Sequence, residues 1–255
     1  MTPVPAPPLR SKSGAAPSIR AILFDKDGTL IDFRKTWLAA YRGAAAELAE
    51  AAGLRPAFVD VLLARHGYDA TTDTFIAESP LLWATTHDQA VLWSAEPELA
   101  GVADVEQRLE RHFSDLDAYP PVPVTDLVPL FERLRRRGFK LGVATMDSTR
   151  AAAATLARFA AAGLVDFLAG CDGGHGIKPT PGMVLGFCAA AGVAPGEVAV
   201  VGDHPADLAM ARAAGAGLAI AVLTGGCPAA ALAAEADLVL PSIAELEAAL
   251  AGFRP

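Results

Sequence analysis

The sequence predicts an α/β protein in which a doubly wound parallel sheet is interrupted by an inserted all-α domain. From residue 118 to the C-terminus, short apolar runs alternate with amphipathic helical segments, a pattern typical of a parallel sheet. Between residues 36 and 117, apolar residues recur at helical spacing and no buried-strand pattern occurs. A chain of 255 residues suits one large domain, or a core that carries an inserted module.

The first predicted strand is the apolar run 21–24, which leads directly into Asp25, Lys26 and Asp27. Four consecutive apolar residues ended by turn residues are typical of a buried parallel strand. Two carboxylates this close repel each other, so a cation or a shared proton must stabilise them. An ordinary strand that ends in an Asp-Gly turn gives the same local pattern, so this stretch alone does not decide between a turn and a site.

Residues 36–117 are predicted to form a helical cap domain of roughly 80 residues, enough for a small module. Helical spacing runs from Trp37 to Ala52, where Gly53 is a plausible stop, and resumes from 58 to 66. Further helical patches are expected around 75–76, 81–93 and 105–113.

The core is predicted to comprise residues 19–35 and 118–255. Right-handed crossovers between parallel strands place the carboxyl ends of all these strands on one edge of the sheet. The remaining helices are expected at 126–137, 148–162, 181–192 and 206–214, and after the capping box Ser242-x-x-Glu245. The remaining strands are expected at 139–144, 165–168, 197–201, 218–223 and 238–240.

The composition and net charge argue against several kinds of binding partner and indicate a cellular compartment. A formal charge of −8 argues against a nucleic-acid or anionic-membrane surface, and no apolar run approaches a membrane span. Residues 1–18 are rich in Pro, Ala and Ser and are expected to be a disordered tail rather than a secretory signal. The three cysteines lack the spacing of a zinc site or a disulfide framework. We therefore expect a cytoplasmic protein, monomeric or homodimeric, without nucleic-acid or membrane partners.

Six chemistry-bearing side chains lie at the ends of the predicted strands or just beyond them, and should converge on one edge of the sheet. Carboxylates are the ligands that Mg²⁺ prefers, and two or three suffice because the ion keeps several waters. A hydroxyl and an ammonium group can hold a phosphate, and an aspartate can form a covalent phosphoryl intermediate. The constellation therefore predicts phosphoryl transfer. Its members are Asp25, Asp27, Thr145, Lys178, Asp203 and Asp207.

Four motifs in these positions resemble, in identity and in order, the signature motifs of the haloacid dehalogenase superfamily. The resemblance covers the core from about residue 19 to the C-terminus, and the insertion resembles the helical (C1-type) cap of the phosphoglycolate-phosphatase-like branch. It implies a Rossmann-like core and a Mg²⁺-dependent phosphatase that hydrolyses a small, phosphoglycolate-like phosphomonoester through an aspartyl-phosphate. The motifs are Asp25-Lys26-Asp27-Gly28-Thr29-Leu30, Thr145, Lys178-Pro179 and Gly202-Asp203-x-x-x-Asp207.

The resemblance also implies a role for each acidic residue. Asp25 is expected to be the nucleophile, and Asp27 to protonate the leaving alcohol and then activate the hydrolytic water. Asp25 and Asp203, together with the backbone carbonyl of Asp27, are expected to bind Mg²⁺. Asp207 is expected to orient Lys178 or a metal-bound water from behind the ligands, although helix capping explains an aspartate there almost as well.

The phosphate is expected to be held by Thr145 and Lys178, with Met146 and Lys26 also at the phosphate site. Three residues depart from the superfamily's usual pattern. Lys26 replaces an apolar residue, but its backbone amide can still bind phosphate; Met146 follows Thr145 where asparagine is frequent. His204 replaces a small hydroxyl residue after Asp203, and either supports the site from further out or is merely exposed.

Other branches and other classes of protein fit less well. Dehalogenases lack the second acid; phosphonate-cleaving members need a cap lysine, and the chain has none between Thr36 and Phe139. Sugar-phosphate mutases usually have Glu where this chain has Gly202, and transport ATPases have Thr in place of Asp27. A non-catalytic receiver-like phospho-switch would be about half this length and would stop after one equivalent of phosphorylation.

The substrate is the least constrained part of the prediction. A mobile cap over an open-faced site favours small phosphomonoesters, and sugar phosphates, nucleotides and pyrophosphate are alternatives to phosphoglycolate. One hypothesis is that Arg42, Arg65 or His87 in the cap contacts an anionic group of the substrate. The competing interpretation is that these three are solvated helix residues.

Overall fold

Six parallel strands form the central sheet of the structure, a computed structural model that describes residues 18–76 and 78–253. The doubly wound parallel sheet predicted from the sequence is confirmed, whereas the predicted tail, except for Ser18, lies outside the described residues. In spatial order the strands are β5 (Phe167–Ala169), β4 (Lys140–Ala144), β1 (Ala21–Phe24), β6 (Val198–Gly202), β7 (Leu218–Val222) and β8 (Leu238–Leu240).

The strand order reverses at β1, whose neighbours are β4 on one side and β6 on the other. Phe24, the last residue of β1, is in register with Val143 of β4 and Val201 of β6. The three strands therefore end at nearly the same level, so the residues that follow them are neighbours. Ligands of open α/β sheets bind at such a reversal point, outside the carboxyl ends of the strands.

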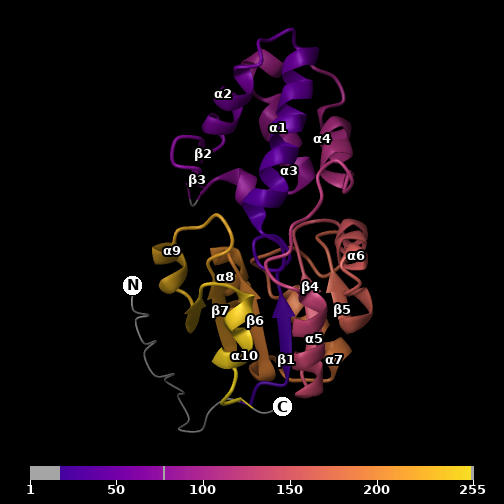
Figure 1. The fold of residues 1–255 in the computed structure, drawn as a ribbon, viewed down its shortest axis with the longest axis vertical. Helices are drawn as coiled ribbons and strands as arrows, with labels where there is room; N and C mark the ends of the chain where they lie inside the picture. Colours follow the sequence, from indigo (N-terminus) through magenta and orange to yellow (C-terminus); the bar gives the residue numbers. More distant parts are fainter. Residues whose placement is uncertain (1–17, 77, 254–255) are drawn as a thin grey trace.

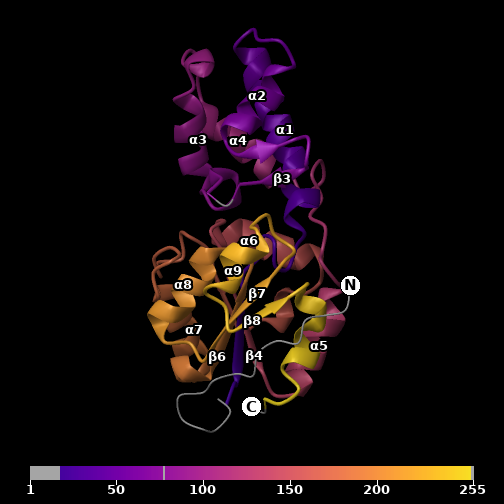
Figure 2. The ribbon, with the colours of Figure 1, turned by 90° about the vertical axis from the view of Figure 1, so that its left-hand side faces the viewer.

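Helices cover both faces of the sheet (Figure 2). Apolar residues of α5, α6 and α10 pack on one face, where the rings of Phe24 and Phe131 lie 5.4 Å apart. Apolar residues of α7, α8 and α9 pack on the other face. The helices are α5 (Leu127–Arg136), α6 (Thr149–Arg158), α7 (Gly182–Ala191), α8 (Pro205–Ala214), α9 (Ala229–Ala233) and α10 (Leu246–Ala249), with short 3-10 helices at Ala162–Leu164, Pro195–Glu197 and Ile243–Glu245.

The insertion forms a separate helical body beyond the carboxyl ends of the strands (Figure 1). It has its own apolar cluster, in which Trp93 and Leu48 are fully buried. We call this body the cap; the predicted division at residues 36 and 117 stays a prediction. Its helices are α1 (Phe33–Ala51), α2 (Phe58–Arg65), α3 (Thr86–Ser94) and α4 (Val105–Ser114), with short 3-10 helices at Pro80–Leu82 and Pro97–Leu99.

The prediction of an all-α insertion is wrong at one place, because the cap contains a small antiparallel hairpin. Strands β2 (Tyr68–Asp69) and β3 (Thr74–Phe75) pair where a helical patch was expected around 75–76. Asp69 closes the turn by accepting hydrogen bonds from Thr71 N and from Thr72 Oγ1, each at 2.8 Å. Side-chain acceptors of this kind offer the backbone an alternative to helix.

Two composition-based expectations can be compared with the structure. Within the described ranges, Cys171, Cys188 and Cys227 are free thiols, the last two buried. None of the helices in those ranges combines the length and the apolar composition needed to cross a membrane.

Candidate active site

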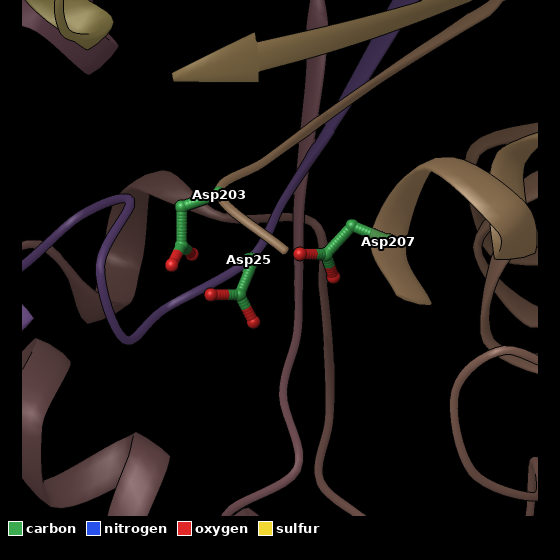
Figure 3. A group of neighbouring side chains, drawn as sticks. All are labelled: Asp25, Asp203 and Asp207. Atoms are coloured by element: carbon green, nitrogen blue, oxygen red, sulfur yellow. The ribbon is translucent and has the colours of Figure 1, made fainter. Parts of the chain in front are cut away.

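Three buried carboxylates meet beyond the carboxyl ends of β1 and β6. Asp25 follows β1, Asp203 follows β6, and Asp207 lies in the first turn of α8. These residues are 8%, 5% and 2% exposed, and one side-chain oxygen of each lies within 4.8 Å of the others. Figure 3 shows the three carboxylates turned toward one another, with Asp25 between Asp203 and Asp207. The predicted convergence of strand-end acids is therefore present.

The local backbone leaves room for the Asp203 carboxylate. Gly28 has a φ of +83°, and a Cβ at this position would collide with the Asp203 carboxylate. A Cβ at Gly225 would meet the same group. Thr29 Oγ1 donates a hydrogen bond to Asp203 Oδ1 at 3.1 Å, which fixes the orientation of the carboxylate. The Asp-Gly-Thr stretch thus forms a turn, as one interpretation expected, and this turn also positions the Asp203 carboxylate.

Asp207 and His204 form a capping box at the start of α8. His204 N donates to Asp207 Oδ2 at 3.1 Å, and His204 Nδ1 accepts from Ala206 N at 3.1 Å. Burial lowers the pKa of His204, so the neutral imidazole that can accept this bond is favoured. His204 is half-buried, and both side chains border the cavity described below. This capping box at the start of α8 therefore holds Asp207 beside the other two acids.

Lys178 lies among the three carboxylates and pairs with two of them. Its ammonium group contacts Asp25 and lies 2.6 Å from Asp207 Oδ1. Burial acts to lower the pKa of Lys178, but the charges of Asp207 and Asp25 outweigh it and raise the pKa above its ordinary value. Lys178 is therefore a permanent cation at the pH of any plausible assay.

One lysine does not balance three buried acids. Burial raises the pKa of Asp25 to about 7, and the charges of Asp207 and Asp27 add to the rise, whereas Lys178 opposes it. Burial and the charge of Asp25 likewise raise the pKa of Asp203 well above its ordinary range. Asp207 Oδ1 is buried, and its close contact is the same Lys178 ammonium group that also pairs with Asp25. An all-oxygen cluster with excess negative charge fits a divalent cation such as Mg²⁺.

Asp27 points away from this cluster, toward the cap and β4. Its Oδ1 accepts hydrogen bonds from Trp37 Nε1 at 2.6 Å and from Lys26 Nζ at 2.9 Å. Its Oδ2 accepts a long hydrogen bond from Thr145 Oγ1 at 3.4 Å. The side-chain cluster that could hold a metal thus contains Asp207 in place of Asp27. The backbone carbonyl of Asp27 as a ligand stays a prediction.

Lys26 is fully buried and is held by two acids. Its Nζ lies 2.9 Å from Asp27 Oδ1 and 3.0 Å from Asp147 Oδ2, and 5.4 Å from the centre of the Trp37 ring. Burial acts to lower the pKa of Lys26, but Asp27 and Asp147 raise it above its ordinary value. The ammonium group therefore supports Asp27 from behind and does not border the cavity; phosphate binding by its backbone amide stays a prediction.

A cavity of about 80 Å³ lies over the carboxylates and beneath the cap. Eight of the nine predicted site residues border it, the exception being Lys26. The hydroxyl of Thr145 accepts from Asp147 N at 3.1 Å and donates to Asp27, which fixes it at the end of β4. The eight are Asp25, Asp27, Thr145, Met146, Lys178, Asp203, His204 and Asp207.

Sequence reasoning missed Trp37 and Asp147, which hold Asp27 and Lys26. Asp147 had a detectable signal, because it follows a strand-end residue, Thr145, at the same spacing that separates Asp25 and Asp27. Trp37 had none, since its helical spacing is that of any apolar residue on α1. Its contact with Asp27 depends on how the cap sits over the sheet.

The three cap residues proposed to bind an anionic substrate group all pair elsewhere. Arg42 pairs with Asp60 at 2.9 Å, Arg65 with Glu96 and Glu98, and His87 Nδ1 lies 3.2 Å from Glu106. Of the described side chains that border the cavity, none is Arg42, Arg65 or His87. The hypothesis that one of them contacts the substrate is therefore not supported by the structure, and their interpretation as solvated helix residues fits better.

Comparisons with known proteins identify a matching family model and structures of similar fold. Residues 19–215 match the family model described as hydrolase, haloacid dehalogenase-like hydrolase. No curated protein sequence matches the chain at a significant level.

Solved structures from three organisms resemble the whole chain. A HAD phosphatase from Thermococcus onnurineus is 24% identical, with a TM-score of 0.66 over 93% of this chain and 100% of that one. A predicted phosphoglycolate phosphatase from Haemophilus somnus 129PT is 19% identical, with a TM-score of 0.67 over 91% and 97%. CbbY from Rhodobacter sphaeroides, solved with phosphate, is 24% identical, with a TM-score of 0.62 over 89% and 96%. At these identities the likenesses demonstrate a shared fold.

Proposed function

The chain belongs to the haloacid dehalogenase-like hydrolases, and on that premise we propose that it is a Mg²⁺-dependent phosphatase of small phosphomonoesters. The observation that carries the proposal is the convergence of Asp25, Asp27, Thr145 and Lys178 on one small cavity beneath the cap. Nucleophile, acid/base, hydroxyl donor and cation are the groups that phosphoryl transfer through an enzyme carboxylate requires.

In the first step, a carboxylate oxygen of Asp25 attacks phosphorus and the bond to the leaving alcohol breaks. Asp27, protonated at this stage, donates its proton to the departing oxygen. Because Trp37 and Lys26 both donate to Oδ1 of Asp27, the proton is carried on Oδ2, and Thr145, whose hydrogen bond to Oδ2 is long, turns its hydroxyl hydrogen to the bound phosphoryl group. The products of this step are the free alcohol and an aspartyl-phosphate on Asp25.

In the second step, water attacks the phosphorus of the aspartyl-phosphate. Asp27, now a carboxylate, accepts the proton of that water at Oδ2, and the bond between phosphorus and Asp25 breaks. Inorganic phosphate leaves, and both aspartates return to their starting states. Lys178 and Thr145 hold the phosphoryl oxygens in both steps, since they border the same cavity as Asp25.

Asp25, Asp203 and Asp207 are the side chains that would hold the metal ion. The ion supplies positive charge that offsets the repulsion between the Asp25 carboxylate and the phosphate. Thr29 fixes Asp203, and the α8 capping box fixes Asp207, so two of the three ligands are oriented before any ion binds. We also propose a cytoplasmic monomer or homodimer with a small-molecule substrate.

The test is a phosphatase assay with and without Mg²⁺ on phosphoglycolate, sugar phosphates, nucleotides and pyrophosphate. We expect continuous release of phosphate that a chelator abolishes, and no release by Asp25→Asn. The matched control is Asp117→Asn, because Asp117 is an exposed aspartate outside the cavity that pairs with Arg158. Release that stops after one equivalent would indicate a phospho-switch, and activity retained by Asp25→Asn would remove Asp25 as the nucleophile.

A further inference from the structure

The part of the cavity wall that the cap contributes is aromatic and uncharged. Phe33, Trp37, Tyr41, Trp83 and Phe113 border the cavity from the cap side. Among the described residues, no lysine, arginine, histidine or acid of the cap borders it. The charged groups around the cavity all come from the core, where the phosphoryl group would react. The cap side is therefore the wall that would face the leaving alcohol.

Gln89 is a buried polar residue in this wall. It lies on α3, its side chain is 2% exposed, and it borders the cavity. Neither Oε1 nor Nε2 of Gln89 has a hydrogen-bond partner within residues 18–76 and 78–253. Buried amides are almost always hydrogen-bonded, because leaving one unpaired costs free energy. A buried, unpartnered donor and acceptor at a cavity wall indicate that a ligand supplies the partners.

Other polar groups of the same wall are already engaged within the protein. Tyr41 donates its hydroxyl hydrogen to the carbonyl of Leu81 at 2.7 Å. Trp37 donates to Asp27, as described above, and Thr85 donates to Asp88 Oδ2 at 2.7 Å. Gln89 is thus the buried cap group that keeps both a donor and an acceptor free for a bound molecule.

The chemistry of this wall restricts the leaving group. A carboxylate beside aromatic rings loses its hydration without gaining a cation, which is unfavourable. An uncharged amide or hydroxyl can both donate to Oε1 and accept from Nε2 of Gln89. The cavity volume of about 80 Å³ lies well below the roughly 300–1,000 Å³ of larger ligand sites, so the leaving group must be small.

We infer that Gln89 binds an uncharged amide or hydroxyl group of the leaving alcohol, so that the enzyme selects small phosphomonoesters with uncharged leaving groups over those that carry a carboxylate. This inference rests on the proposed phosphatase function. It implies that phosphoglycolate itself is not the preferred substrate. Gln89 is accordingly a specificity residue of the cap, while the bond-breaking groups all belong to the core.

Three phosphomonoesters of nearly equal size test the inference: phosphoglycolate, its amide, and isobutyl phosphate. They present a carboxylate, an amide and an apolar group in the same position. For the wild-type enzyme we expect kcat/KM for the amide to exceed that for phosphoglycolate by about tenfold or more. A preference for the carboxylate would overturn the inference.

The variant Gln89→Leu removes the hydrogen-bonding groups at nearly constant volume. We expect kcat/KM to fall about tenfold for the amide, while isobutyl phosphate is turned over at least as well as by the wild type. The melting temperature should stay or rise, since the unpartnered amide is gone; a purely structural glutamine would lower it. The matched control is Gln107→Leu, because Gln107 is the only other glutamine and lies exposed on α4.

The outcomes separate this inference from the proposed function. Turnover of isobutyl phosphate depends on the core chemistry and not on Gln89. If none of the three esters is hydrolysed while another phosphomonoester is, the inference is overturned and the proposed function stands; if no phosphomonoester is hydrolysed, both are overturned. If all are hydrolysed but Gln89→Leu changes the amide and the apolar ester equally, only the inference is overturned. If Gln89→Leu fails to fold, the inference is tested by kcat/KM of Gln89→Met for the amide and by the wild-type preference between the amide and the carboxylate.

Discussion

Lys26 is the residue that most distinguishes this site at the level of single side chains. Lys26 is 1% exposed, and burying a charged group this completely costs free energy unless the charge is paired. Lys26 is paired with both Asp27 and Asp147. Its ammonium group and the indole of Trp37 converge on one oxygen of Asp27. The result is a fixed orientation of the proposed acid/base, achieved without adding a cation to the cavity.

Replacing this lysine should therefore cost stability. We expect Lys26→Met to lower the free energy of unfolding by about 3 kcal/mol, because Asp27 and Asp147 lose their buried partner. Urea unfolding at pH 7 measures the change. Adding Asp147→Asn should recover part of the loss, since one of the two unpaired charges is then gone.

The control for this prediction is Lys140→Met, which removes an exposed lysine paired with Asp166. It should change stability by less than about 1 kcal/mol. Equal effects of Lys26→Met and Lys140→Met would show that the buried pairs contribute nothing beyond a surface ion pair.

At the level of elements, α1 and α4 of the cap are tied together by one carboxylate. Glu47 of α1 pairs with Arg108 at 2.6 Å, Arg111 at 2.7 Å and His112 at 2.9 Å, all on α4. Partial burial acts to raise the pKa of Glu47, but the hydrogen bond from His112 and the charge of Arg111 outweigh it and lower the pKa. The ionised form of Glu47 thus stabilises the helix pair.

This pairing predicts a pH-dependent loss in Glu47→Gln. Because the folded-state pKa is lowered, the stabilisation is fully present above 4.5, the ordinary pKa of Glu, and is lost as the pH falls through the folded value. We expect a deficit of about 1 kcal/mol at pH 7, measured by urea unfolding, that disappears at acid pH. Glu50→Gln, at an exposed position on the same helix, should show no such deficit; a deficit independent of pH would contradict the assignment.

Most helices and strands of the core could be predicted from the sequence because they have local signals, whereas the short helix α9 was not predicted. Ser148 caps α6, and Ser242 and Glu245 form the expected capping box. The β2–β3 hairpin could not be predicted, since each strand has only two residues and no alternation can develop over that length. The helical patch expected over 81–93 is divided, because Thr85 caps a new helix after a short 3-10 turn.

At the level of the whole molecule, the charge imbalance at the sheet edge predicts that metal binding stabilises the fold. At a Mg²⁺ concentration of about 100 times the Kd, the gain is roughly 2.7 kcal/mol, visible as a rise in melting temperature over the chelated protein. Asp203→Asn should abolish this rise. Sodium chloride at equal ionic strength is the control, and an equal rise with it would mean screening of charge and not a bound divalent ion.

The groups of the site that could be predicted from the sequence are those at strand ends. Asp25, Thr145 and Asp203 follow parallel strands, and right-handed crossovers place the carboxyl ends of such strands on one edge of the sheet. The contacts of Trp37 and Gln89 could not be predicted, because they depend on the placement of the cap over the core. No spacing along the chain encodes that placement.

The most direct test of the central claim is to identify the residue that carries the phosphoryl group. The wild-type enzyme is mixed with substrate and Mg²⁺, acid-quenched within the first turnover, and reduced with borohydride, which converts an aspartyl-phosphate to homoserine. Trypsin cuts after Arg20 and Lys26, so Asp25 is the only acid in the peptide 21–26. The account predicts homoserine in that peptide, and none without substrate. Homoserine in another peptide, or in none while phosphate is still released, would contradict it.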